Sequence, residues 1–290
     1  MPTSRPASGV HAGAQELHDV AYADGSRAQV LDLYLPARTG TAVPLVVYVH
    51  GGAFSGGDKS DHLPPVGALR DHGYAVANLD YRLSGEAPFP AAVQDVKAAV
   101  RWLRAAAPRY GVDPGRFGAW GDSAGGYLVT MLGVTGDQRT LFDDAALGHA
   151  AVSSAVQAVV DWYGPSDFLA MDAQARAAGC TDPQVHDAAD SPESSWLGAP
   201  IRSVPALVRS ANPITWTATA RRLPPFLVAH GSADCTVPAA QSTLLVAALR
   251  ARHAPVTHTV LPGAVHGDPA FARDQIVPAL AFLDRALSRT

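Results

Sequence analysis

Segment 116–133 constrains the fold most strongly, because it joins two apolar runs through a turn that few sequences can form. The run at 116–120 predicts a strand, and the run from 123 to about 133 predicts a helix. Between them, the sequence GDSAG at 121–125 places Ser123 with a glycine two residues to either side. Glycine suits both positions because a Cβ atom there would clash with a neighbouring strand or helix. The segment therefore predicts a serine held in a strained turn at the end of a strand.

The rest of the chain alternates predicted strands with predicted helices. Residues 20–35 alternate apolar and polar side chains around a turn dipeptide, which predicts an antiparallel hairpin. The last helix covers 268–287 and is expected to break or kink near Pro278. This order predicts an α/β fold in one domain over 1–290, with a mostly parallel central sheet, the antiparallel hairpin at its N-terminus and helices on both faces. The later strands are predicted near 45–49, 74–79, 156–163, 226–230 and 256–261.

Segment 164–222 interrupts this alternation, since proline and glycine recur throughout it. A compact domain rarely contains so long an irregular connection unless the connection covers a binding site. We therefore expect short helices and loops that form a lid or cap-like insertion over the end of the sheet where Ser123 lies.

The composition argues against several classes of partner. The 290 residues carry a formal net charge of −4, which leaves no basic face for nucleic acid or for an anionic membrane. No apolar run is long enough for a signal peptide or a membrane span. We therefore expect a soluble protein that is cytoplasmic, or secreted if an export signal has been removed.

Ser123 needs a base and an orienting acid, because an unassisted hydroxyl is almost fully protonated near neutral pH. In a sheet of this kind the partners follow the serine along the chain, on loops after later strands, in the order acid and then histidine. Asp234 follows the next-to-last predicted strand and His266 follows the last one, so they are the predicted partners. Asp167 also follows a strand and is the alternative acid, although it would have to reach across the sheet. His230 is expected to brace the exit of its strand.

A glycine-rich loop follows the first buried strand, with the sequence HGGAFSGG at 50–57. Its small side chains would let the N–H groups of Gly52 and Ala53 approach a carbonyl oxygen, and the N–H of Ala124 at the start of a helix would complete an oxyanion hole. Asp58 stands where a phosphate-binding loop has lysine, and no GxGxxG opens a helix. The histidines lack HExxH or comparable ligand spacing. We therefore expect neither a cofactor nor a metal.

The two cysteines, Cys180 and Cys235, are too few for a disulfide scaffold and too far apart for a CxxC motif. They are either two buried thiols or one bridge that ties the irregular segment to the residue after Asp234. A bridge that closes a loop of this size contributes about 2–5 kcal/mol when it is unstrained.

Together these motifs resemble the α/β-hydrolase superfamily and, within it, carboxylesterases of the hormone-sensitive-lipase-like kind. The matching motifs are HGGAF at 50–54, DYR at 80–82, GDSAGG at 121–126, HGSAD at 230–234 and the loop that carries His266. The resemblance implies a serine carboxylesterase that hydrolyses carboxylic esters through an acyl-enzyme on the serine of the third motif.

Two departures from that family matter. Ala53 stands where the family often has a third glycine, and the hairpin begins too early for the large N-terminal helical cap of many such esterases. A short cap and the sequence DSPESSWLG at 190–198 are similar to bacterial feruloyl and acetyl-xylan esterases, which implies a small-molecule or carbohydrate-linked ester as the substrate. Aromatic residues near the motifs are the candidates for the substrate pocket, namely Phe54, Tyr127, Trp162, Phe168 and Trp196.

Two other functions stay open at this point. The same triad would serve an amidase or a serine peptidase, and a hydrolase fold also serves as a non-catalytic binding protein. The binding protein normally has a broken triad, whereas each predicted triad member is present here. Comparing the turnover of an ester and an amide with the same acyl group distinguishes an esterase from an amidase or peptidase.

Overall fold

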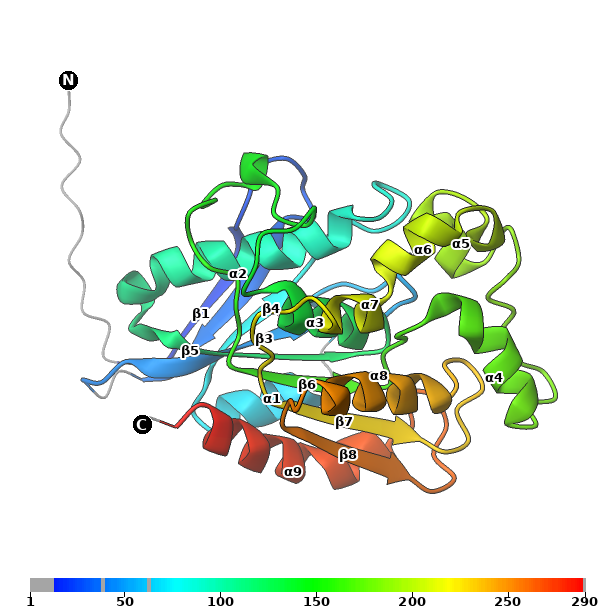
Figure 1. Ribbon diagram of the computed structural model, residues 1–290. Coiled ribbons are helices and arrows are strands. Elements are labelled where there is room, and N and C mark those ends of the chain that lie inside the picture. Colours follow the sequence, from blue (N-terminus) through cyan, green and yellow to red (C-terminus); the bar gives the residue numbers. More distant parts are fainter. Residues whose placement is uncertain (1–12, 38–39, 62–63, 289–290) are drawn as a thin grey trace.

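A sheet of eight strands runs through the centre of the protein (Figure 1). The computed structural model describes residues 13–37, 40–61 and 64–288, and the other residues of the predicted 1–290 domain lie outside this description. The strands are β1 (Gln15–Ala21), β2 (Val30–Leu35), β3 (Val43–Val49), β4 (Ala75–Leu79), β5 (Val112–Asp122), β6 (Ala158–Trp162), β7 (Phe226–Gly231) and β8 (Val256–Leu261). Their order is β1-β2-β4-β3-β5-β6-β7-β8; β2 pairs antiparallel with β1 and β4, and the other neighbours pair parallel. This confirms the predicted mostly parallel sheet with an antiparallel N-terminal hairpin.

The central strands send their side chains alternately into two apolar cores, one on each face of the sheet. In β3, Leu45, Val47 and Val49 pack into one core, whereas Val46 and Tyr48 pack into the other. A strand that is buried on both faces needs apolar side chains on both, which explains the continuous apolar run that predicted it.

Helices cover both faces of the sheet, as predicted (Figure 1). The long ones are α1 (Pro64–Asp71), α2 (Ala91–Tyr110), α3 (Ala124–Thr135), α8 (Ala240–Ala251) and α9 (Ala270–Ala286), and a 3-10 turn, η1, covers Ala145–Leu147. Helices α2, α3 and α8 pack into the core that contains Leu45, whereas α1 and α9 pack into the core that contains Val46. None of the helices in the described part of the chain is both long and apolar enough to cross a membrane.

The last helix does not break near Pro278, so this one of the two predicted outcomes, a break or a kink, is wrong. Helix α9 continues from Ala270 to Ala286 and contains Pro278 in its interior. Proline removes one N–H donor, so the carbonyl of Asp274 loses its helical partner. Asp274 and Pro278 are both exposed, so that carbonyl can bind solvent and the proline ring does not enter the core.

Segment 164–222 forms short helices at the carboxyl ends of the parallel strands, toward which the arrowheads of β7 and β8 point in Figure 1. It contains α4 (Met171–Ala177), α5 (Pro192–Leu197), α6 (Pro205–Ala211), α7 (Pro213–Thr217) and the 3-10 turns η2 (Phe168–Ala170) and η3 (Ile201–Ser203). Its side chains Phe168, Trp196 and Val208 are fully buried in the same core as α3. The segment therefore extends the core and does not merely cover it.

Candidate active site

Ser123 occupies a sharp turn between β5 and α3. Its backbone has φ 53° and ψ −121°, which is strained for a residue with a side chain. A Cβ atom on Gly121 would lie 2.4 Å from the carbonyl carbon of Gly125, and one on Gly125 would lie 2.0 Å from the carbonyl oxygen of Val49. The N–H of Ser123 donates to the carbonyl of Trp162 at 2.9 Å, which fixes the turn against β6. These close approaches account for both glycines of the motif.

Ser123, His266 and Asp234 form a continuous line of hydrogen bonds. The Ser123 hydroxyl lies 2.9 Å from His266 Nε2, and His266 Nδ1 lies 2.7 Å from Asp234 Oδ2. Asp234 follows β7 and His266 follows β8, so two neighbouring parallel strands bring both side chains to one edge of the sheet. The His266 side chain is 21% exposed, whereas that of Asp234 is buried. This arrangement allows His266 to take a proton from Ser123 while Asp234 holds the opposite ring nitrogen.

The Asp234 carboxylate is held by contacts on both oxygens. Oδ1 accepts the N–H groups of Thr236 and Val237 at 2.9 and 2.8 Å. Oδ2 lies 2.7 Å from His266 Nδ1 and 3.3 Å from His230 Nε2. Burial by itself raises the pKa of Asp234, but the hydrogen bonds with His230 and His266 outweigh burial and hold the pKa well below its usual range. Asp234 is therefore an ionised carboxylate at neutral pH.

His230 braces the loop that carries Asp234. Its side chain is fully buried, its Nε2 donates to the carbonyl of Val237 at 2.7 Å, and its Nδ1 lies 2.6 Å from the Ser242 hydroxyl. Because a carbonyl only accepts, Nε2 carries the proton, and in the neutral ring Nδ1 accepts from Ser242. This is the bracing position expected for His230 from the sequence.

Asp167, the alternative acid, lies in a different network. Its Oδ1 accepts from Asn212 Nδ2 at 2.9 Å, and its N–H donates to Gln241 Oε1 at 2.7 Å. The carboxylate therefore binds within segment 164–222, whereas His266 has Asp234 as its carboxylate partner. The geometry favours Asp234 over Asp167.

The loop after β3 approaches Ser123 closely. A Cβ atom on Gly51 would lie 2.7 Å from Asp122 Oδ2 and 3.2 Å from the Cβ atom of Ser123, so glycine at this position relieves close contact with the turn. The next residues turn sharply, with φ 115° at Gly52 and 51° at Ala53. A Cβ atom on Gly52 would lie 2.1 Å from the carbonyl oxygen of Gly56, so this glycine is required as well.

The expected oxyanion donors are the backbone N–H groups of Gly52, Ala53 and Ala124. Within the described ranges, no hydrogen bond to another residue uses the N–H of Gly52 or of Ala53. Ala124 begins α3, where the first N–H groups of a helix have no partner within the helix. Gly51 approaches Ser123 and Ala124 follows it directly, so the N–H groups of Gly52, Ala53 and Ala124 stay the expected oxyanion donors.

Tyr163 contacts His266 and was not singled out by the sequence. Its ring packs edge-to-face against the His266 imidazole, with centroids 4.8 Å apart, and against Phe271 at 4.5 Å. These contacts limit rotation of the imidazole. Tyr163 is the first residue after β6, and residues just beyond strand ends collect at the functional edge of such a sheet, which is the signal that could have identified it.

Asp161 is a buried carboxylate beneath the turn. Burial raises its pKa to about 6, although hydrogen bonds from the Gly164 N–H and the Thr130 hydroxyl, and the nearby His230, act in the opposite direction. A raised pKa means that the folded state disfavours the ionised form. The stabilisation is fully present below the unfolded pKa of about 4 and is lost as the pH rises through about 6.

We expect Asp161→Asn to remove this pH dependence. The amide keeps an acceptor for the Gly164 N–H and carries no charge. With about 1.4 kcal/mol per pKa unit, the free energy of unfolding of the wild type should fall by about 3 kcal/mol relative to the variant between pH 4 and pH 7. Urea unfolding of both proteins at the two pH values measures this difference. If the difference in free energy of unfolding between the two proteins is the same at both pH values, the raised pKa of Asp161 is contradicted.

The five aromatic residues predicted to line a pocket lie in the cores instead. Phe54, Tyr127, Phe168 and Trp196 are at most 2% exposed and pack together, with the rings of Phe54 and Trp196 stacked at 4.2 Å. Trp162 is equally buried on the other face of the sheet. The pocket prediction therefore needs correction. Segment 164–222 packs its apolar side chains, including Phe168 and Trp196, against Phe54 and Tyr127 and shields these rings from solvent.

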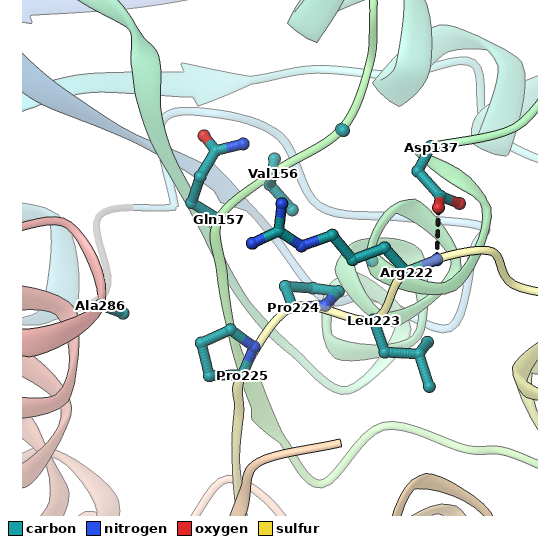
Figure 2. Close-up of a pocket in the computed structure, with 10 residues that line it drawn as sticks. Asp137, Val156, Gln157, Arg222, Leu223, Pro224, Pro225 and Ala286 are labelled. Carbon is teal, nitrogen blue, oxygen red and sulfur yellow. Dashed lines mark hydrogen bonds between the residues drawn. The ribbon is translucent and has the colours of Figure 1, made fainter. Parts of the chain in front are cut away.

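Two hollows differ in their position relative to Ser123. One, of about 520 Å³, adjoins the oxyanion loop and is lined by His50, Ser60, Asp61, Asp122 and three glycines. The other, of about 410 Å³, lies near the amino ends of β6 and β7, and Figure 2 shows Arg222 extending across it. The first hollow therefore lies next to the turn that carries Ser123, because Gly51 and Asp122 line it, whereas Ser123 and His266 are not among its lining residues. Among the described residues, no group of three or more His, Cys, Asp or Glu side chains is arranged to hold a metal ion.

Cys180 and Cys235 form a disulfide, with their Cα atoms 5.7 Å apart. Of the two alternatives that the sequence leaves open, the structure contains the bridge. It joins the residue after Asp234 to segment 164–222, just beyond the end of α4. The bridge therefore connects the insertion directly to the edge of the site.

Curated relatives of the chain include two proteins of Mycobacterium tuberculosis strain H37Rv. Esterase LipC is 32% identical over 254 residues, which cover 86% of this chain and 59% of LipC. Esterase LipQ is 29% identical over 259 residues, which cover 87% of this chain and 57% of LipQ. The chain thus spans less than three fifths of the length of these relatives.

A solved structure described as a truncated form of a carbohydrate esterase from gut microbiota is similar over 98% of this chain and 99% of its own, with a TM-score of 0.84 and 30% sequence identity. The family model BD-FAE matches residues 31–249, a range that includes Ser123 and Asp234 and ends before His266. The match covers most of the chain, and together with the fold it confirms the resemblance to α/β-hydrolases. The protein belongs to the BD-FAE family of α/β-hydrolases.

Proposed function

We propose that the protein is a serine carboxylesterase that forms an acyl-enzyme on Ser123. The observation that carries this proposal is the hydrogen-bond line from Ser123 through His266 to Asp234, at 2.9 and 2.7 Å. The names of the relatives LipC and LipQ, both esterases, support the same reaction class.

Acylation begins when His266 Nε2 takes the proton of the Ser123 hydroxyl and the serine oxygen attacks the carbonyl carbon of the ester. The carbonyl oxygen gains negative charge and accepts hydrogen bonds from the N–H groups of Gly52, Ala53 and Ala124. His266 then donates the proton to the oxygen of the departing alcohol. The acyl group stays on Ser123 as an ester.

Deacylation repeats these steps with water as the nucleophile. His266 takes a proton from the water, the hydroxide attacks the acyl carbon, and the same N–H groups bind the new oxyanion. The proton returns to the Ser123 oxygen as the carboxylic acid leaves. Throughout, Asp234 stays ionised and stabilises the imidazolium, which its low pKa favours.

The hollow beside the oxyanion loop favours an ester whose alcohol part carries several hydroxyl groups. Its lining offers the exposed side chains of Ser60 and Asp61 and contains no large apolar side chain, whereas His50 and Asp122 of the same lining are almost fully buried. Hydroxyl groups both donate to carboxylates and accept from other groups, so a sugar fits this lining better than an aliphatic alcohol. The similar solved structure is described as a carbohydrate esterase, which supports the same substrate class.

Matched substrates test the reaction and the substrate class together. We expect kcat/KM for acetylated methyl xyloside to exceed that for cyclohexyl acetate, a ring without hydroxyls, by at least about tenfold, as one or two added hydrogen bonds would give. We expect p-nitrophenyl acetate to be hydrolysed and 4-nitroacetanilide, its amide counterpart, not to be. Faster cleavage of the amide would make the protein an amidase. Equal rates on the two ring esters would contradict the sugar assignment.

A further inference from the structure

The orientation of the Asp234 carboxylate depends on the path of the chain through Cys235. Oδ1 of Asp234 accepts the N–H groups of Thr236 and Val237, which both follow Cys235. Cys235 is covalently bound to Cys180. Any movement of Cys235 therefore moves the donors that orient this carboxylate.

The other end of the disulfide is anchored in the core. Cys180 follows α4, and its N–H donates to the carbonyl of Ala175 at 3.1 Å. Met171 and Ala175 of this helix are fully buried, and the Asp172 carboxylate accepts two backbone N–H groups from further along the segment. The bridge therefore fixes Cys235 to a part of the protein that is itself held in place.

Gln241 provides a second, separate tie between segment 164–222 and α8. Its side chain is fully buried, and its Oε1 accepts the N–H groups of Ser166 and Asp167, both at 2.7 Å. Its Nε2 donates to the carbonyl of Asp167 at 2.9 Å and to Gln174 Oε1 at 2.6 Å. Gln241 lies C-terminal to the Asp234 loop, and its hydrogen bonds do not involve the disulfide. They therefore keep segment 164–222 attached to α8 when the disulfide is reduced.

We propose that the Cys180–Cys235 disulfide positions the acid of the proposed triad and that a dithiol reductant opens this link and slows turnover. In the reduction, one thiolate of the reductant attacks a sulfur of the bridge and displaces the other sulfur as a thiolate. The second thiol of the reductant then releases the first cysteine, so the protein ends with two thiols and the reductant with one disulfide. Both cysteines are partly exposed, which gives the reductant access.

The expected effect is on kcat and not on KM. Neither cysteine lines the hollow beside the oxyanion loop, and neither belongs to the proposed nucleophile, base or oxyanion donors, so we expect binding of the ester to be unchanged. A loosened Asp234 loop aligns the carboxylate less well with His266 Nδ1, and misplacement of about 1 Å costs up to about a hundredfold. We expect kcat to fall by about tenfold, with KM within about twofold of the oxidised enzyme.

The experiment compares the oxidised wild type, the wild type reduced with dithiothreitol, and the Cys180→Ser/Cys235→Ser variant. Thiol titration confirms the redox state, and circular dichroism confirms that each form is folded. The variant should match the reduced wild type and should not respond to dithiothreitol, and reoxidation should restore only the wild type. A reduced wild type with two free thiols, a native spectrum and full kcat would overturn the proposal. So would a fall in activity that comes from KM alone or from global unfolding.

This inference rests on the proposed function, and the two fail differently. If the oxidised wild type hydrolyses no ester, the proposed function fails. If it hydrolyses esters equally well in both redox states, only the positioning role of the disulfide fails.

Discussion

Ser123→Ala should reduce kcat for p-nitrophenyl acetate by at least about a thousandfold. The substitution removes the hydroxyl that lies 2.9 Å from His266 Nε2, and no acyl-enzyme forms without it. The turn itself should persist, because the N–H of residue 123 still donates to Trp162 and its carbonyl still accepts from Tyr127. The remaining activity would come from the oxyanion donors and from substrate binding.

The control for this variant is Ser195→Ala, an exposed serine on α5 whose substitution should leave kcat within about twofold of the wild type. A fluorophosphonate probe adds an independent reading, because it labels only an activated serine. We expect labelling in the wild type and in Ser195→Ala, and none in Ser123→Ala. Turnover or labelling that persists in Ser123→Ala would place the nucleophile elsewhere.

The features that local chemistry dictates are the ones the sequence predicts well. The apolar run of β3 is continuous because both faces of the strand are buried, and the glycines around Ser123 are needed because Cβ atoms would collide with neighbouring backbone. Asp234 and His266 follow adjacent parallel strands, so a general rule of sheet topology brings them together. Each of these predictions depends on a single segment or on the order of segments.

Contacts between distant segments that follow from no rule of sheet topology are not predicted. Phe54 and Trp196 are far apart in the sequence, and only the folded chain stacks one on the other and buries both. Tyr163 packs against His266, and Gln241 binds Ser166, without a motif that announces either contact. Large aromatic side chains occur in cores and in pockets for the same physical reason, which is the burial of apolar area. Sequence alone therefore cannot separate the two environments.

Asp234→Asn should lower kcat by about a thousandfold or more while KM stays within about threefold of the wild type. The amide oxygen takes the place of Oδ1 and accepts the N–H groups of Thr236 and Val237, so the NH2 group faces His266 Nδ1. An amide donor opposite Nδ1 forces that nitrogen to accept, and the ring proton moves to Nε2. His266 then presents a hydrogen to Ser123 and cannot take its proton.

Asp167→Asn is the matched control, because it makes the same isosteric change in the other carboxylate that the sequence offers as the triad acid. In this variant the amide oxygen continues to accept from Asn212, and the contact between His266 and Asp234 is untouched, so kcat should stay within about threefold of the wild type. Steady-state kinetics on p-nitrophenyl acetate, with circular dichroism to verify folding, compare the two variants directly. The reverse result, a large loss in Asp167→Asn and a small one in Asp234→Asn, would assign the acid to β6 and would require His266 to turn away from Asp234. The edge-to-face packing of Tyr163 and the hydrogen bond between His266 Nδ1 and Asp234 Oδ2 both oppose that rotation.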